Sequence, residues 1–302
     1  MFSKRSFSML LSAGLLATGL FFSACEDTVT PVDTGTPTAV TGVMALSSGD
    51  SSVSLKWTSS SYETNSNFKD MNIEFTDGSA NFEIASPLAK GTTSVNITGL
   101  KTGTEYTFSI YTRGTDGKKS TAATIKWSPA KRWTKFTNGN DIKLYETSSS
   151  FASGLTFTAT GPESHVLADA NMWDLCLDTR NDSYDIGSPA LSSYTISAAR
   201  TTLIAFDTAK YKNVTALNDV FESASLNPTK ETLVNFNGVT KGFMFNFKTK
   251  DGNYGRVLVK ATGGAILQGT APNRYVDLEI SYNPTANKPY GLAGKAEETA
   301  NK

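Results

Sequence analysis

A two-residue alternation of apolar and polar side chains runs through residues 37–128 and constrains the fold more than any other feature of the sequence. An extended chain with this pattern presents its large apolar groups on one face. Four runs share the pattern: Val53, Leu55 and Trp57; Met71, Ile73 and Phe75; Val95 and Ile97; Tyr106, Phe108 and Ile110. The dipeptides Asp77-Gly78 and Asp116-Gly117 lie between runs and are typical of tight turns. Short strands and turns at this spacing predict a β-sandwich.

The segment around Leu100 adds a more specific signal, because Tyr106 follows it by six residues. This arrangement resembles the tyrosine corner of fibronectin type III modules, in which a tyrosine hydroxyl bonds to backbone a few residues upstream. Pro37 at the start and Trp57 in the second strand extend the resemblance over residues 37–128. Such modules host many functions and usually serve as spacers or docking surfaces, so the resemblance implies binding without naming a ligand.

The N-terminus has the anatomy of a secretory signal. Lys4 and Arg5 supply positive charge, and an apolar stretch follows at residues 9–22. Cys25 comes directly after small residues, and this order resembles the signal of bacterial lipoproteins. The resemblance implies removal of residues 1–24 and lipidation of Cys25, and two or more acyl chains anchor a protein stably. The alternative is an ordinary secreted protein whose cleavage site happens to contain a cysteine.

The residues after Cys25 indicate a location in the cell envelope. Acidic Glu26 and Asp27 follow the cysteine, and this pair resembles the signals that send lipoproteins to the outer membrane or the cell surface. Residues 25–36 have no apolar period, which predicts an unfolded tether. We therefore expect a bacterial outer-membrane lipoprotein that is exposed on the surface and held to the membrane by its N-terminal lipid.

The charge of the chain argues against a nucleic-acid-binding protein, and its cysteine content argues against a protein stabilised by disulfides. The chain has 28 basic and 28 acidic residues, and loss of Lys4 and Arg5 with the signal leaves 26 against 28. A mature formal charge of −2, without a basic patch, argues against nucleic-acid binding. If Cys25 is lipidated, Cys176 is the only thiol left, so no intramolecular disulfide can form and stability must come from packing.

Residues 129–290 form a second unit in which strand-like runs predominate. The runs are 156–160, 173–177, 202–206, 242–249, 254–261 and 275–282. Asp251-Gly252 predicts a hairpin between the fourth and the fifth run. Residues 214–226 have apolar positions at helical spacing before Asn227-Pro228, which predicts one short helix. We thus expect a mainly β chain, with a fibronectin-type sandwich, a β-rich second domain containing one short helix, and a disordered tail at 291–302.

Motifs of the common enzyme classes are missing from the sequence. It contains one histidine, His165, which excludes the two-histidine zinc motif. It also has no Gly-x-Ser-x-Gly elbow, phosphate-binding loop or dinucleotide glycine pattern. A triad through His165 and Asp169 lacks a marked nucleophile. We therefore predict that the protein is not an enzyme, and we assign no catalytic residue.

Five aspartates form the densest group of carboxylates: Asp169, Asp174, Asp178, Asp182 and Asp185. They could hold calcium, but Arg180 occupies the place of a ligand in an EF-type loop and no glutamate closes the loop. The simpler interpretation is a strand followed by a polar turn, and we assign no metal site.

The string Trp173-Asp174-Leu175-Cys176-Leu177-Asp178 is the most distinctive of the second unit. As a strand it places Trp173, Leu175 and Leu177 on one face, with Cys176 on the other as a quiet half-buried thiol rather than a nucleophile. Together with residues 239–259, where a Lys-Asp-Gly-Asn-Tyr hairpin joins two strands, the string resembles the C-terminal region of HmuY-type haem-binding lipoproteins. The resemblance implies that domain 129–290 captures a haem-like ligand at the cell surface.

The chain departs from this family where the iron would be bound, because the best-known members use two histidines. Haem iron also accepts thioether and phenolate ligands, so the axial candidates are Met172, His165 and Met244, besides nearby tyrosines. A simpler place for Met244, between Phe243 and Phe245, is the core, and for His165 it is an exposed loop. Haem is therefore a cofactor that only the resemblance implies.

A glycan- or protein-binding adhesion module is the second hypothesis. Seven aromatic residues could supply a stacking platform: Trp127, Trp133, Tyr184, Tyr194, Tyr275, Tyr282 and Tyr290. The alternative for most of them is a place in the core or at strand edges. A hydrolase is the third hypothesis, and a glycosidase would need two carboxylates aimed across one sugar, a pairing that sequence alone does not show.

Overall fold

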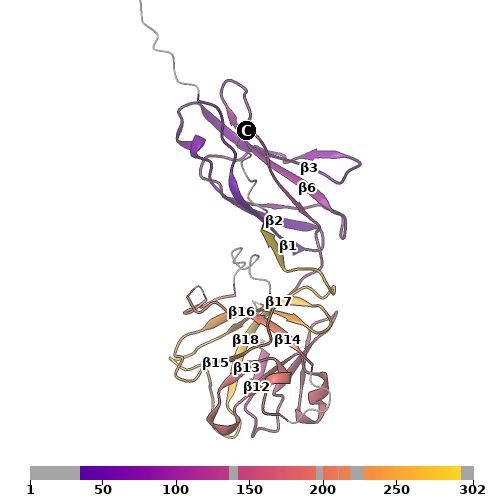
Figure 1. Ribbon diagram of the computed structural model, residues 1–302, viewed down its shortest axis with the longest axis vertical. Coiled ribbons are helices and arrows are strands. Elements are labelled where there is room, and N and C mark those ends of the chain that lie inside the picture. The colour runs from indigo at the N-terminus through magenta and orange to yellow at the C-terminus, as the bar shows by residue number, and fades with distance from the viewer. Residues whose placement is uncertain (1–34, 136–141, 195–199, 210, 218–227, 294–302) are drawn as a thin grey trace, which may run out of the picture. The chain divides into compact units, whose positions relative to one another are not determined.

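The computed structural model describes residues 35–135, 142–194, 200–209, 211–217 and 228–293. Within these ranges the regular structure is almost entirely antiparallel β-strand, with a few short 3-10 helices (Figure 1). The expected mainly β fold is confirmed. The same ranges contain no helix with the length and apolar character needed to cross a membrane.

The N-terminal sandwich contains two four-stranded sheets. The first has the order β19-β1-β2-β5, with bounds Gly291–Ala293 for β19, Thr41–Gly49 for β1, Ser52–Thr58 for β2 and Ser94–Ile97 for β5. The second has the order β4-β3-β6-β7, with bounds Asn81–Glu83 for β4, Phe68–Thr76 for β3, Tyr106–Gly114 for β6 and Ala123–Trp127 for β7. A 3-10 turn, η1 (Ser61–Thr64), connects β2 to β3.

The apolar runs found in the sequence form the core of this sandwich. Every residue of the four runs is buried except Phe75 and Val95, which pack against the core from its margin. The hydroxyl of Tyr106 accepts a hydrogen bond from the amide of Lys101 at 3.1 Å. The predicted sandwich and its tyrosine corner are therefore both present.

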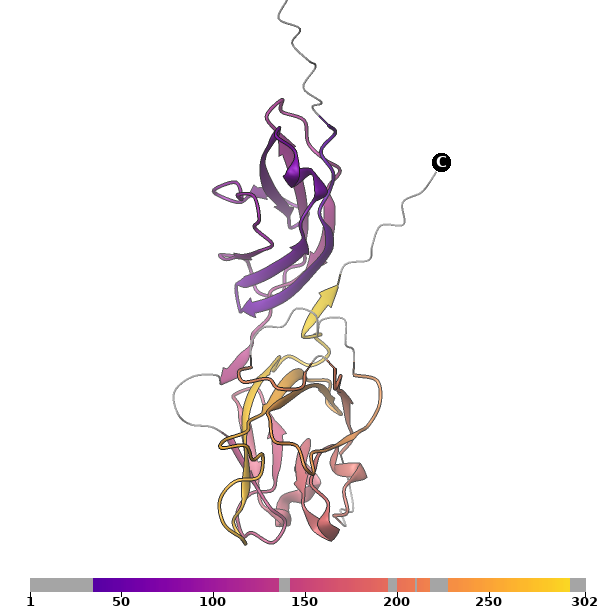
Figure 2. The ribbon, with the colours of Figure 1, turned by 90° about the vertical axis from the view of Figure 1, so that its left-hand side faces the viewer.

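The C-terminal domain is a second sandwich (Figure 2). Its five-stranded sheet has the order β11-β10-β12-β13-β15, with bounds Pro162–His165 for β11, Gly154–Phe157 for β10, Leu175–Asp178 for β12, Asp185–Gly187 for β13 and Leu233–Asn235 for β15. The other sheet has the order β14-β16-β17-β18-β8, with bounds Thr202–Ala205 for β14, Phe243–Thr249 for β16, Tyr254–Val259 for β17, Tyr275–Tyr282 for β18 and Trp133–Lys135 for β8. Strand β9 (Ile142–Tyr145) also pairs with β18.

One apolar core holds these two sheets together. Leu155, Leu175 and Leu177 point into it from the five-stranded sheet, while Phe245 and Phe247 enter from β16. The six strand-like runs of the sequence each correspond to a strand, with boundaries within three residues and with β18 matching at both ends. The predicted hairpin turn is present between β16 and β17.

The outer face of the five-stranded sheet carries short helical turns. They are η2 (Leu167–Met172), η3 (Arg180–Asp182) and η4 (Pro189–Leu191). Trp173 packs there with Cys176 and Tyr194, and not with Leu175 as the alternation suggested. That expectation was wrong because β12 begins only at Leu175, so Trp173 ends η2 and the strand period does not extend to it.

Three other expectations concern the chain outside these sheets. Residues 214–217 are not helical, and the remainder of the predicted helix, 218–226, lies outside the described residues. Gly291–Ala293 form β19 and pair with β1 instead of starting the tail, whereas residues 294–302 lie outside the described part. The signal, Cys25 and the tether up to residue 34 also lie outside it.

Candidate ligand-binding site

A hollow of about 300 Å³ opens on the C-terminal sandwich. Its lining comes from four segments that are distant in sequence: Tyr184 before β13, residues 236–240 after β15, residues 264–267 after β17, and Arg274 before β18. The volume lies at the lower end of the range typical of small-ligand pockets. The strand pairing of the two sheets therefore assembles one concave surface from loops.

Backbone hydrogen bonds fix one wall of this hollow. The amide of Phe236 donates to the carbonyl of Tyr184 at 2.8 Å, which extends the pairing of β15 with β13 by one step. The amide of Val239 donates to the carbonyl of Phe236 at 3.0 Å and closes a tight turn. Gly238 has a φ of +71° in this turn, a conformation that glycine adopts without strain.

A second tight turn contributes Gly264 and Ala265 to the lining. Thr262 and Ala265 exchange backbone hydrogen bonds of 2.9 and 3.1 Å, with Gly263 and Gly264 at φ values of +61° and +81° between them. A Cβ on either glycine would meet no atom within 4 Å. The positive φ, and not lack of space, is what requires glycine at these two positions.

An adjoining hollow of about 210 Å³ shares Thr240 and Gly264 with the first. Its other lining residues include Lys241 next to Thr240 and Lys260 directly after β17. Because two residues line both spaces, we treat them as one site and call it the groove. Its first hollow contains Tyr184, and its second contains the two lysines.

The aromatic wall of the groove is formed by Tyr184 and Phe236. Their ring centroids are 6.0 Å apart, with the ring planes inclined by 56°. Phe236 is buried, whereas Tyr184 is half-buried. Phe236 thus supports the tyrosine from the core side, and part of the Tyr184 ring remains accessible, which is the geometry that lets an aromatic group stack against a ligand.

Arg274 is held rigidly at the edge of the same hollow. Its Nε and Nη2 donate to Oε2 of Glu146 at 3.0 and 2.7 Å, and its amide donates to Oε1 at 2.8 Å. These bonds lower the pKa of Glu146 and raise the pKa of Arg274, which also gains from a hydrogen bond with Tyr184. Both charges are therefore maintained at neutral pH, and Arg274 has a fixed orientation beside Tyr184.

The charge of the groove lining has one sign. The described residues that line its two hollows include Arg274, Lys241 and Lys260 but no aspartate or glutamate. The same lining has no histidine or cysteine that could act as acid, base or nucleophile. The groove has the groups to bind and orient a ligand, with amide and hydroxyl groups from Asn237 and Thr240.

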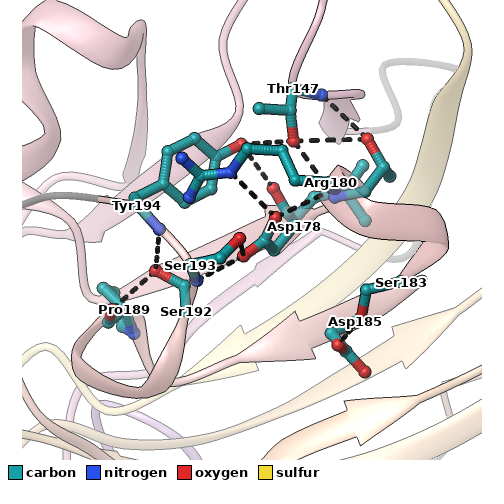
Figure 3. A network of polar contacts seen from close by, with 11 residues as sticks. Thr147, Asp178, Arg180, Ser183, Asp185, Pro189, Ser192, Ser193 and Tyr194 are labelled. Carbon is teal, nitrogen blue, oxygen red and sulfur yellow. Dashed lines mark hydrogen bonds and ion pairs between the residues drawn. The ribbon is translucent and has the colours of Figure 1, made fainter.

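A separate network organises the outer face of β12 (Figure 3). Asp178 is buried and accepts hydrogen bonds from the amide and the hydroxyl of Ser193, both at 2.5 Å, and from the amide of Arg180 at 3.1 Å. The Arg180 guanidinium lies 3.8 Å from the centre of the Tyr194 ring. The Tyr194 hydroxyl bonds to Thr147 at 2.9 Å. This aspartate binds protein groups on several sides and so holds the segment before residue 195 on the sheet.

Asp174 has a comparable role on a different loop. Its carboxylate accepts hydrogen bonds from the amide of Phe157 at 3.0 Å and from Nε of Arg200 at 2.8 Å. Arg200 also forms an ion pair with Asp251 in the β16–β17 turn. Burial raises the pKa of Asp174, although its hydrogen bonds oppose this shift. The aspartates thus serve separate loops, and within the described ranges no group of three or more His, Cys, Asp or Glu side chains is placed to hold a metal.

The structure places the three residues proposed as haem ligands in two different parts of the C-terminal domain. Met244 is fully buried with Leu258 and other apolar groups, as its core interpretation predicts. His165 does not lie in an exposed loop as expected: it ends β11 and is half-buried, and its Nε2 atom is buried without a hydrogen-bond partner among the described residues. Met172 is exposed at the end of η2, which packs on β10 and β11. His165 and Met172 therefore share one region of the domain, and Met244 has no surface for a porphyrin.

Cys176 is fully buried, and not half-buried as expected, and most of the seven candidate aromatic residues also belong to the interior. Burial raises the pKa of the Cys176 thiol, which keeps it protonated and unreactive at neutral pH. Trp127, Tyr194, Tyr282 and Tyr290 are buried. Of the seven, Tyr184 alone appears among the described residues that line the groove.

Sequence reasoning missed the remaining groove residues. Arg274, Lys241 and Phe236 follow or precede strands, and no local pattern marks them as neighbours. The available signals were Asn237-Gly238 and Gly263-Gly264, which are turn dipeptides but do not show which turns face each other.

Comparison with known proteins identifies the N-terminal sandwich. Residues 38–127 match the family model of the fibronectin type III domain, which confirms the resemblance found in the sequence. The chain therefore carries a fibronectin type III domain, and such domains are typically binding modules rather than catalysts. No curated protein matches the chain.

Several solved structures resemble parts of the chain. The FN5 domain of Drosophila Lar is 19% identical, covers 31% of this chain and 98% of its own, and has a TM-score of 0.23. An Fn3-like protein from Clostridium thermocellum is 21% identical, with 32% and 97% covered and a TM-score of 0.25. A DUF4466 family protein from Parabacteroides merdae is 11% identical, with 85% and 96% covered and a TM-score of 0.35. These likenesses are too distant to carry an argument about function.

Proposed function

We propose that this protein is a lipid-anchored binding protein of the bacterial cell envelope, and that its C-terminal sandwich binds a saccharide in the groove. One observation carries the proposal: the half-buried ring of Tyr184 borders a hollow of about 300 Å³ that also contains Asn237 and Thr240. Saccharides offer flat apolar faces that stack on aromatic rings and hydroxyl groups that pair with amides and hydroxyls. The fibronectin type III domain fits a binding or adhesion role for the whole chain.

The groove supports binding in preference to hydrolysis. Glycoside hydrolysis commonly uses two carboxylates that flank the scissile bond. The described lining residues of the groove supply none, and their only strongly charged groups are cations. A saccharide held there would be retained without being cleaved.

Saccharide binding is tested by affinity electrophoresis of the chain without residues 1–24 and with Cys25→Ala, run in gels that contain a panel of polysaccharides. Tyr184→Ala should weaken retention about five- to tenfold, which corresponds to loss of roughly 1–1.5 kcal/mol of stacking energy. Tyr184→Phe should retain most of the affinity. The matched control is Tyr254→Ala, because Tyr254 is also half-buried in the same domain but does not line the groove. Equal effects of Tyr184→Ala and Tyr254→Ala would contradict the assignment of the groove.

Membrane attachment through Cys25 is a separate part of the proposal. It is supported by the order of charged, apolar and small residues before Cys25. Fractionation of cells that express the full chain tests it: Cys25→Ala should release the protein from the membrane fraction. Membrane retention of that variant would contradict lipid anchoring, and protease treatment of intact cells would show whether the anchored chain faces outward.

Haem capture is the second candidate function, and one observation favours it. His165 and Met172, two chemically suitable axial donors, lie in the same β11–η2 region, and Nε2 of His165 has no hydrogen-bond partner. Titration of the same soluble chain with haem should give a saturable, shifted Soret band that weakens in His165→Ala or Met172→Ala. A spectrum equal to the sum of free haem and protein would remove this candidate.

A further inference from the structure

We propose that the groove selects anionic saccharides, with a sugar ring against Tyr184 and its carboxylate or sulfate group at Lys241 and Lys260. This inference rests on the proposed saccharide binding and adds the chemical class of the ligand. It follows from the arrangement of three features: the aromatic wall, the shared boundary between the hollows, and the charge of the second hollow.

The aromatic hollow and the basic hollow of the groove are continuous. Thr240 lines both hollows, and Lys241 is the next residue in the chain. Gly264 also lines both and carries no side chain that would divide them. A ligand with its ring against Tyr184 can therefore extend past Thr240 towards the lysines without crossing a wall of side chains.

The three cations of the groove, Arg274, Lys260 and Lys241, differ in how strongly carboxylates pair with them. Arg274 is bound by a buried carboxylate, because Oε2 of Glu146 lies 2.7 Å from its Nη2. Lys260 has a longer ion pair, with Nζ 3.8 Å from Oε1 of Glu279, and at least one further interaction. Lys241 is exposed, and none of the described carboxylates forms an ion pair with it. Lys241 is therefore the cation of the groove to which no described carboxylate supplies a compensating charge.

The lysines of the second hollow contrast with the net charge of the rest of the chain. The mature sequence is slightly acidic, with a formal charge of −2 once Lys4 and Arg5 are removed with the signal. The presence of two lysines in the second hollow is thus a local feature and not a consequence of a basic protein. A lysine ammonium is a compact point charge that attracts carboxylate and sulfate alike, so the lysines select for charge without specifying either group.

Two pairs of polymers test this selectivity, because the members of each pair share a sugar backbone and differ in whether it carries anionic groups. The first pair is polygalacturonate and its fully methyl-esterified form, and the second is dextran sulfate and dextran. We expect the soluble Cys25→Ala chain to bind at least one anionic polymer about tenfold more tightly than its neutral partner in 50 mM salt, with the difference shrinking as salt screens the lysines. Preference within the first pair alone identifies a uronate ligand, and preference within the second alone identifies a sulfated one.

Charge-neutralising variants locate the effect. Lys241→Gln with Lys260→Gln should reduce the affinity for the anionic polymer about five- to tenfold, which is the loss of two solvent-screened ion pairs, and so remove most of the difference between the anionic and the neutral polymer. The control is Lys230→Gln with Lys250→Gln, which removes the same charge from two exposed lysines of the same domain outside the groove. Equal loss in both double variants would show a general charge effect and overturn the inference.

The outcomes separate this inference from the proposed function. If Tyr184→Ala weakens binding of neutral and anionic polymers equally and no anionic form is preferred, saccharide binding stands and the charge selectivity is refuted. If Tyr184→Ala changes no binding, the groove is not the saccharide site and both proposals fail. Thermal unfolding of each variant must match that of the unmodified chain for either outcome to count.

Discussion

Replacement of Asp178 by asparagine tests whether a single buried carboxylate holds the outer face of β12 in place. Asp178 is only 2% exposed and accepts hydrogen bonds from both the amide and the hydroxyl of Ser193 as well as from Arg180. Asparagine has nearly the same shape, so the variant removes the charge and half of the acceptor capacity without opening a cavity.

The expected loss follows from the bonds that asparagine cannot make. One oxygen can stay with Arg180, but the NH₂ group then faces the amide of Ser193, and two donors meet. A hydrogen bond to a charged group is worth about 1.5–3 kcal/mol, and the bond from Arg180 also weakens when the charge is lost. We therefore expect Asp178→Asn to lower the free energy of unfolding of the C-terminal domain by about 2–4 kcal/mol, a large share of the 5–15 kcal/mol typical of a domain.

The pH dependence gives the prediction a second, independent readout. Burial alone would raise the pKa of Asp178, but the hydrogen bonds from Ser193 and Arg180 outweigh it and the net pKa is lowered. A carboxyl group whose pKa is lower in the folded state stabilises the protein above its unfolded pKa of about 3.9 and loses that effect as pH falls through the folded value. The deficit of Asp178→Asn should thus be constant between about pH 7 and 5 and shrink below about pH 4.

Urea denaturation of the full chain measures the deficit, with the two domains read separately by pulse-labelling hydrogen exchange. Asp182→Asn is the matched control, because Asp182 is exposed at a φ of +58°, where asparagine is well tolerated, and should change stability by less than about 0.5 kcal/mol. The reasoning is refuted if Asp178→Asn is no worse than this control at pH 7, or if its deficit is as large at pH 3 as at pH 7.

Three further predictions concern packing, the tyrosine corner and the buried thiol. Gly154→Ala should destabilise the C-terminal domain by about 3 kcal/mol, since a Cβ there would lie 2.1 Å from the Trp173 ring, and a midpoint of urea denaturation equal to that of the unmodified chain would contradict this packing. Tyr106→Phe should destabilise the fibronectin type III domain by about 1 kcal/mol, because the amide of Lys101 loses its acceptor, and should leave the C-terminal transition unchanged in the same experiment. Cys176 should react with a thiol reagent only after unfolding, because burial raises its pKa; rapid labelling of the native chain at pH 8 would show that the site is open.

The predictable part of the fold is the part in which local patterns are long enough to read. The four alternating runs, of which the last extends from Tyr106 to Ile110, predicted strands of the first sandwich. The tyrosine corner indicated the fibronectin type III family. In the second sandwich, the seven- and eight-residue strands β16 and β18 were located almost to the residue. Each of these strands has several buried positions, so its period is visible without knowledge of its neighbours.

The short strands were not predictable for the same reason. β13 and β15 have three residues each, too few to show any period, and their pairing with one another depends on contacts between residues about fifty positions apart. The groove could not be predicted from the sequence for the same reason, because Phe236 lies next to Tyr184 only through the pairing of β13 with β15. Trp173 illustrates the opposite error, in which a period was extended across the boundary between η2 and β12.

The buried aspartates and the position of the groove are connected. Asp174 and Asp178 use their carboxylates on backbone amides and arginines, and so fasten segments of the chain over the outer face of β12. A covered sheet face cannot serve as an open stacking platform, which leaves the loops at the strand ends as the place where aromatic side chains reach a ligand. Tyr184 lies in such a loop, on the far side of η3 from Asp178, with its backbone carbonyl paired to Phe236 and its ring against the hollow. Asp174 and Asp178 therefore stabilise the scaffold, and the proposed binding groups are the aromatic and basic residues of the turns.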